Sequence, residues 1–131
     1  MQSKSNTVLL IYPTHYKVTG LPVGLASLAS NLRRGRFEVL VFDTCFYKDE
    51  VKDQESTRAS ILSTKKIKNE NVYWKPKTSD LKEDIIALIN KSRPIVVGIT
   101  VLENTFRLSL EIINHIKECF NDLTVVAGGI F

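Results

Sequence analysis

The sequence feature that most constrains the fold is the segment 94–101, which carries almost no polar side chain. Most of its residues are β-branched, and they do not alternate between apolar and polar positions. A strand with this pattern is buried on both faces, as in a parallel sheet covered by helices. Pro94 stands at its start, where a missing backbone N–H is best tolerated. Because polar residues follow at its carboxyl end, we expect ligands to bind at that edge of the sheet.

Three further segments are predicted to be strands, and three are predicted to be helices. The strands are expected at 7–12, 37–42 and 124–127, where apolar residues run together. The helices are expected at about 23–34, from a cap at Ser79 through Ile89, and at about 105–120. Gly35 is the expected stop signal of the first helix. A weaker pattern indicates a short helix within 49–65.

These elements alternate along the chain, which predicts an α/β domain with a parallel sheet of the flavodoxin-like or Rossmann-like kind. Right-handed crossovers place the strands in the order 2-1-3-4, with the switch point between the first and third strands. We expect residues 1–131 to form one domain, interrupted by a long insertion or lid at 44–78. The fourth strand would then have an open edge. We therefore expect the fold to be truncated before a fifth strand, or this edge to join a second copy of the chain.

Composition excludes several classes of protein. No apolar run approaches the roughly 18–20 residues that cross a bilayer, and residues 1–6 lack the features of a secretory signal. We therefore expect a cytoplasmic protein with no membrane partner. The two cysteines are too few for a zinc or iron–sulfur site, so we assign no metal ligands. A net charge of +4 fits scattered surface lysines, and we expect no nucleic-acid partner.

The strand ends lack the common nucleotide-binding motifs. Neither Gly-x-Gly-x-x-Gly nor Gly-x-x-x-x-Gly-Lys-Ser/Thr follows the first strand, which also does not end in the acidic residues of a receiver domain. The topology brings four other segments to the ligand-binding edge: 13–24, 43–46, 100–105 and 128–129. The paired glycines in the last of these permit close approach by a bulky group.

An ordered set of short motifs resembles one family, the N-terminal cobalamin-binding domain of cobalamin-dependent radical S-adenosylmethionine enzymes. The family motifs are "P…PxGLxxLA", "GxxVxxxD", "PDVVGISV" and "IIRxIK…VVVGGxH". The matching segments here are Pro13 with 21–29, 35–39 with Asp43, 94–100, 113–117 and 125–129. The resemblance covers the chain except for 44–77, and its specificity comes from the order of the motifs.

The resemblance implies a flavodoxin-like domain that holds cobalamin with its nucleotide tail threaded between the first and third strands. By position, Thr100 and Val101 would line the tail, and the glycine pair at 128–129 would make room for its sugar-phosphate and base. Residues from His15 to Gly24 would approach the corrin ring. The cofactor-binding residues expected in this way are Pro13, His15, Tyr16, Gly20, Gly24, Asp43, Thr100, Val101, Asn104, Thr105, Gly128 and Gly129.

Two departures from the family pattern limit what this chain does alone. Many cobalamin domains carry Asp-x-His-x-x-Gly, whose histidine binds cobalt, but here Asp43 is followed by Thr44 and Cys45. We therefore expect no protein histidine on cobalt from this loop. The Cys-x-x-x-Cys-x-x-Cys motif that holds a [4Fe–4S] cluster is also missing. The cluster and S-adenosylmethionine would belong to a downstream radical domain, and this chain would be a binding domain of a methyltransferase, not catalytic by itself.

Two alternative functions fit the same pattern. The chain is compatible with the N-terminal nucleotide-binding half of a two-domain glycosyltransferase, which shares a glycine-containing first loop and a helix like 24–32. It is also compatible with a flavin-binding flavodoxin-like module, although no compact Ser/Thr-rich phosphate loop follows the first strand. The downstream sequence would separate the first two readings, through either three clustered cysteines or a second nucleotide-binding half.

Overall fold

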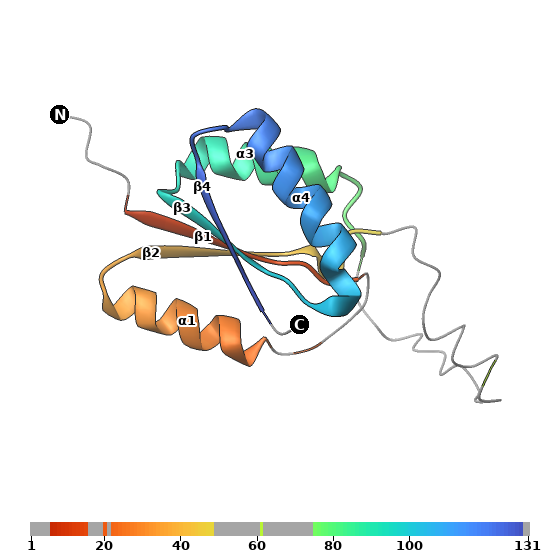
Figure 1. Cartoon of the computed structure of the whole chain (residues 1–131), viewed down its shortest axis with the longest axis horizontal. Helices are drawn as coiled ribbons and strands as arrows, with labels where there is room; N and C mark the ends of the chain where they lie inside the picture. The colour runs from red at the N-terminus through yellow and green to blue at the C-terminus, as the bar shows by residue number, and fades with distance from the viewer. Residues whose placement is uncertain (1–5, 16–19, 21, 49–60, 62–74, 130–131) are drawn as a thin grey trace.

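A computed structural model describes residues 6–15, 20, 22–48, 61 and 75–129 of the chain (Figure 1). Four strands alternate with three long helices: β1 (Thr7–Tyr12), α1 (Val23–Arg34), β2 (Glu38–Asp43), α3 (Leu81–Ser92), β3 (Val96–Thr100), α4 (Phe106–Cys119) and β4 (Thr124–Gly128). Single turns of 3-10 helix, Thr44–Phe46 and Glu103–Thr105, follow β2 and precede α4. The helix predicted within 49–65 lies outside the described residues, apart from Ile61.

The sheet is parallel throughout and has the order β2-β1-β3-β4, as the sequence predicts. Ile11 near the end of β1 pairs with Phe42 of β2 on one side and with Ile99 of β3 on the other. The two most apolar strands are therefore adjacent and point the same way. From β1 the chain continues to β2 on one side of the sheet, and from β3 it continues to β4 on the other side. The switch point, where the direction of strand addition reverses, therefore lies between the carboxyl ends of β1 and β3.

The main hydrophobic core lies between the sheet and the helices α3 and α4, which cover the same face (Figure 1). Alternate residues of β1 and β3 point into it, since successive side chains of a strand face opposite sides. Its most buried members are Leu9, Ile11, Ile85, Ile89, Val97, Ile99, Ile112 and Ile116.

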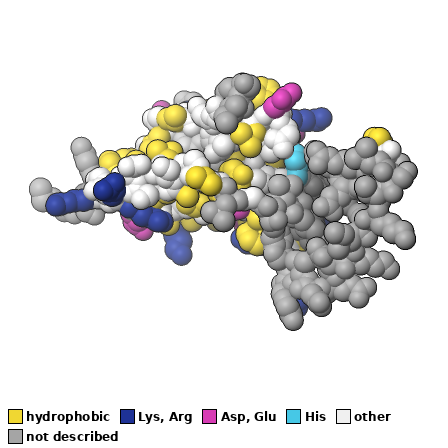
Figure 2. Space-filling model, turned by 90° about the horizontal axis from the view of Figure 1, so that it is seen from below, with side chains coloured by type: hydrophobic (Ala, Val, Ile, Leu, Met, Phe, Trp, Pro, Cys, Tyr) yellow, Lys and Arg dark blue, Asp and Glu magenta, His cyan; other side chains and the backbone are white. Residues whose placement is uncertain are grey.

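A smaller core lies on the other face, where α1 packs against β1 and β2. Ala29 of α1 meets Val8, Leu10 and Val39 there. Among the described residues no second helix covers this face, and Val126 on β4 is 55% exposed. Seen from the α1 side, hydrophobic side chains are scattered over the surface (Figure 2). The buried-strand pattern of 124–127 thus predicts the strand correctly but not its exposure.

The stop of α1 differs from the prediction in one respect. Gly35 is the last half-helical residue, but its φ is −75°, which any residue adopts. The left-handed residue is Arg36, with φ of 66°. Its N–H donates to the Arg33 carbonyl (3.0 Å), and that of Phe37 donates to the Leu32 carbonyl (3.1 Å). This is the usual helix-ending pair of bonds, with arginine where glycine is favoured.

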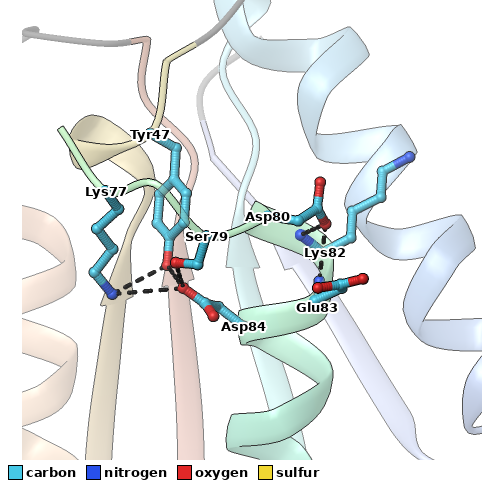
Figure 3. Close-up of polar contacts among 7 residues, drawn as sticks. All are labelled: Tyr47, Lys77, Ser79, Asp80, Lys82, Glu83 and Asp84. Atoms are coloured by element: carbon cyan, nitrogen blue, oxygen red, sulfur yellow. Dashed lines mark hydrogen bonds and ion pairs between the residues drawn. The ribbon is translucent and has the colours of Figure 1, made fainter.

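The start of α3 also corrects a prediction, because Asp80 rather than Ser79 caps the helix. Asp80 Oδ1 accepts hydrogen bonds from the backbone N–H groups of Lys82 (2.8 Å) and Glu83 (3.0 Å) (Figure 3). Either residue type caps helices well, and the exact start of the helix decides between them. Ser79 instead donates to the carboxylate of Asp84 (2.6 Å).

Candidate functional site at the carboxyl edge of the sheet

The ends of β1 and β2 are tied together by a compact set of hydrogen bonds. The Thr14 N–H donates to Thr44 Oγ1 (2.7 Å), which in turn donates to the Thr14 carbonyl (2.6 Å). Thr14 Oγ1 donates to Asp43 Oδ1 (3.0 Å), and so does the backbone N–H of Cys45 (2.9 Å). One Asp43 oxygen is therefore engaged by the fold's own donors. Asp43 positions the loop after β1, and only its second oxygen is left to meet a ligand.

Cys45 lies beside this set of bonds and is 5% exposed. Burial, together with the hydrogen bond and the charge of Asp43, raises the pKa of its thiol to about 12. Since the thiolate is the form that binds metals and attacks electrophiles, Cys45 is unreactive in this environment.

The end of β3 carries a buried hydroxyl group. Thr105 is 2% exposed, and its Oγ1 has no hydrogen-bond partner among the described residues. Its neighbour Ser109 is fully buried and is satisfied, because its Oγ donates to the Thr105 carbonyl (2.9 Å). A buried hydroxyl without a partner is unfavourable, and such a group calls for an explanation. Among the described residues, Thr105 Oγ1 is the one fully buried side-chain polar atom without a hydrogen-bond partner.

A contact across the switch point joins the loops after β1 and β3. His15 Nε2 lies 2.9 Å from the backbone oxygen of Asn104, and donates to it when that nitrogen carries the proton. The two residues are 89 positions apart in the chain. A group that enters between these loops must pass this contact or replace it.

The two glycines after β4 differ in what surrounds them. A Cβ added to Gly128 would meet nothing within 4 Å, whereas one added to Gly129 would lie 1.8 Å from the Val101 carbonyl oxygen. Gly129 is therefore needed for the close packing of two backbones, which the Val101 N–H bond to the Gly128 carbonyl (2.7 Å) holds together. Open space was expected beside both glycines, but only Gly128 has it.

The structure brings most of the predicted site residues to one edge. Thr100 pairs with Gly128 in the sheet, Val101 bonds to it, and His15 meets Asn104. Pro13 is buried at the end of β1. Gly20 and Gly24 have open space around them, and Gly24 lies in the first turn of α1. Tyr16 lies outside the described residues.

Two residues of this edge were not predicted from sequence. Thr44 closes the hydrogen bonds between β1 and β2, and Ser109 satisfies the carbonyl of Thr105. Thr44 directly follows Asp43 at a strand end, where threonine side chains often form hydrogen bonds with nearby backbone groups. Ser109 lies inside α4 and carries no comparable sequence signal.

Comparison with known proteins supports the fold. No protein-family model matches the sequence, and no curated protein matches it significantly. A solved structure does match: the radical S-adenosylmethionine methyltransferase TsrM from Kitasatospora setae, with tryptophan substrate and an S-adenosylmethionine analogue bound. The TM-score is 0.64 at 23% identity, over 95% of this chain and 19% of that one. This chain has a flavodoxin-like, Rossmann-like α/β fold. It spans about a fifth of the length of TsrM.

Two kinds of feature are absent from the described residues. None of the helices in those parts of the chain is both long and apolar enough to cross a bilayer. The described His, Cys, Asp and Glu side chains also form no group of three or more that could hold a metal ion.

Proposed function

We propose that this chain is the cobalamin-binding domain of a cobalamin-dependent radical S-adenosylmethionine methyltransferase. The observation that carries the proposal is the match to TsrM, a radical S-adenosylmethionine methyltransferase, over 95% of this chain. The order of the short motifs in the sequence agrees with that match. The pairing of Ile11 with Ile99 also gives the switch point that such a domain uses.

The carboxyl edge has features that fit a long cofactor tail. The unsatisfied Thr105 hydroxyl offers a hydrogen bond, and the open space at Gly128 leaves room beside Thr100. In the proposal, Thr100, Val101 and Asn104 line the tail, and His15 lies toward the corrin ring. Cobalamin, when bound, supplies a cobalt ion that carries the methyl group. The protein's part would be to hold and orient the cofactor.

The loop after β2 is proposed to give cobalt no ligand. Its positions 44–46 form a turn of 3-10 helix that is tied to Thr14, and Cys45 stays protonated at neutral pH. A thiol in this state is a poor metal ligand. In the proposal, this loop would therefore contribute no side chain to the cobalt.

The decisive experiment is a binding assay with hydroxocobalamin and the full-length protein. The protein is mixed with the corrinoid, free ligand is removed by gel filtration, and the visible spectrum is recorded. Retention of the corrinoid bands at about one per chain supports the proposal, whereas a colourless protein refutes it. Parallel titrations with UDP and with FMN test the glycosyltransferase and flavin alternatives.

A matched pair of variants connects binding to the proposed edge. Gly128→Val fills the open space without meeting any atom within 4 Å of its Cβ, so the fold should be retained while corrinoid affinity falls at least tenfold. Ala127→Val adds bulk to the same strand on the opposite face and should leave affinity within about twofold. Equal affinities for both variants would place the ligand elsewhere.

We also propose two partners for the chain. The first is a downstream radical domain with a [4Fe–4S] cluster and S-adenosylmethionine, toward which the upper corrin face would point. The second is another copy of the chain, joined through β4, which pairs only with β3 among the described residues. Light scattering after gel filtration tests the second, and a monomer at 100 µM, roughly a hundredfold above a typical micromolar Kd, would refute it.

A further inference from the structure

A cluster of polar side chains lies where the chain leaves β2 and where it returns to α3 (Figure 3). The Lys77 N–H donates to the Phe46 carbonyl (2.9 Å), and Tyr47 and Lys77 form a parallel bridge. Residues thirty positions apart are therefore held about one strand spacing, roughly 4.8 Å, from each other. The intervening segment begins and ends at neighbouring points.

The side chains reinforce this main-chain contact. The Tyr47 hydroxyl donates to Asp84 Oδ2 (2.6 Å), and the Ser79 hydroxyl donates to the same oxygen (2.6 Å). Lys77 Nζ donates to the Tyr47 oxygen (3.1 Å) and lies 3.7 Å from Asp84 Oδ2. Asp84 Oδ2 on α3 thus contacts residues on both sides of the connection: Tyr47 before it, and Lys77 and Ser79 after it. The hydrogen bonds from Ser79 and Tyr47 keep the pKa of Asp84 below its usual value.

The cluster is anchored in the main core. Tyr47 is 5% exposed, and its ring stacks on Phe42 of β2 with centroids 5.7 Å apart and planes 23° apart. The Lys77 ammonium lies over both rings, 5.1 Å from the Tyr47 centroid and 5.9 Å from the Phe42 centroid. Hydrogen bonds to a charged group and buried aromatic packing are both stronger than an average surface contact.

We infer that Tyr47, Lys77, Ser79 and Asp84 form a clasp that closes the connection from β2 to α3, so that residues 49–74 are separable from the fold. A right-handed crossover from β2 to β3 needs only one helix, and α3 supplies it. The four strands and the described members of both cores all lie outside the segment that the inference removes. The inference does not depend on the proposed function, because it concerns folding alone.

The contacts of the clasp are expected to offset the entropy that is lost when the connection from β2 to α3 is closed. The entropy lost on closing a loop grows with its length, so the contacts that close a long connection offset a larger loss than those that close a short one. Replacing 49–74 by a short flexible linker should therefore make the clasp less important. The two changes are expected to be non-additive, as for any pair of coupled sites.

The test is a cycle of four proteins followed by thermal unfolding. The first is the full chain, the second carries Gly-Ser-Gly-Gly in place of 49–74, and the other two add Tyr47→Phe to each. We expect the shortened chain to unfold cooperatively with a Tm within about 5 °C of the full chain. We also expect Tyr47→Phe to lower the Tm more in the full chain than in the shortened one. Tyr12→Phe removes a hydroxyl for which no hydrogen bond is seen among the described residues, and it controls for the loss of the oxygen itself.

A second measurement keeps the inference testable if the linker is unsuitable. A recognition site for a specific protease is inserted between residues 60 and 61, and the folded protein is cleaved there. Fragments that stay together in gel filtration and keep the circular dichroism of the intact chain support the inference. Fragments that separate or unfold overturn it, as does a shortened chain without cooperative unfolding or an equal effect of Tyr47→Phe in both backgrounds.

Discussion

The neighbouring glycines after β4 provide a sharp test of the site geometry. Alanine at Gly129 would place its Cβ 1.8 Å from the Val101 carbonyl oxygen, whereas alanine at Gly128 would meet nothing within 4 Å. The obstacle at Gly129 is backbone, so no side-chain rotation relieves it. The two substitutions add the same methyl group one residue apart, and each is the control for the other.

The expected magnitude follows from the displacement that Gly129→Ala requires. A tolerable contact is about 3.2 Å, so the end of β4 must move by more than 1 Å away from Val101. That movement weakens the Val101 N–H bond to the Gly128 carbonyl, now 2.7 Å, which is worth about 1 kcal/mol net. Overpacking adds about 1–3 kcal/mol. We expect Gly129→Ala to lower the free energy of unfolding by roughly 2–4 kcal/mol, and Gly128→Ala to change it by less than about 0.5 kcal/mol.

Urea and thermal unfolding, followed by circular dichroism at 222 nm, measure both values. A loss of about 3 kcal/mol corresponds to a fall in Tm of roughly 10 °C for a domain of this size. The reasoning would be refuted if Gly129→Ala were as stable as the wild type, or if both variants lost equal stability. The second result would mean that Gly128 is also packed, which would remove the space proposed for the cofactor.

Three more predictions concern the helix stop, the clasp and the cysteines. Arg36→Gly should raise the free energy of unfolding by about 0.5–1 kcal/mol, because φ of 66° is strained for arginine. Urea unfolding measures this change, and a variant less stable than the wild type would contradict the prediction. Asp84→Asn should lower stability by about 1–2 kcal/mol at pH 7. Because the folded pKa of Asp84 is lowered, this difference should shrink as the pH falls below about 4, and a difference that grows in acid would be inconsistent with the clasp. Iodoacetamide should label exposed Cys119 well before buried Cys45, as mass spectrometry of the peptides would show; equal rates would disprove the burial of Cys45.

The fold was largely predictable because its signals are local. The unbroken apolar runs at 7–12 and 94–101 predict adjacent buried strands, and the helical spacing between them predicts the crossovers. The handedness rule then leaves the order 2-1-3-4, which the sheet has. Two kinds of error remain. Asp80 and Arg36 take the helix-end positions that the sequence assigns to Ser79 and Gly35, and β4 is more exposed than its apolar run predicts.

The candidate site was predictable in place but not in detail. Strand ends in a parallel sheet meet at one edge, so the sequence correctly indicates that His15, Thr100 and Gly128 lie on the same side of the molecule. It did not reveal that an Asp43 oxygen is engaged by Thr14, or that Gly129 is required by Val101. These facts depend on atoms from different strands, whose separations are set only when the sheet assembles.

Side-chain periodicity along short stretches was enough to determine which segments are strands or helices, and the topology rules then determined which strand ends meet at one edge of the sheet. The tertiary structure decided which donor meets which acceptor. Thr14 and Asp43 are 29 positions apart, Tyr47 and Asp84 are 37 apart, and His15 and Asn104 are 89 apart. Hydrogen bonds need positions accurate to a few tenths of an ångström, and no local pattern carries that information across such separations.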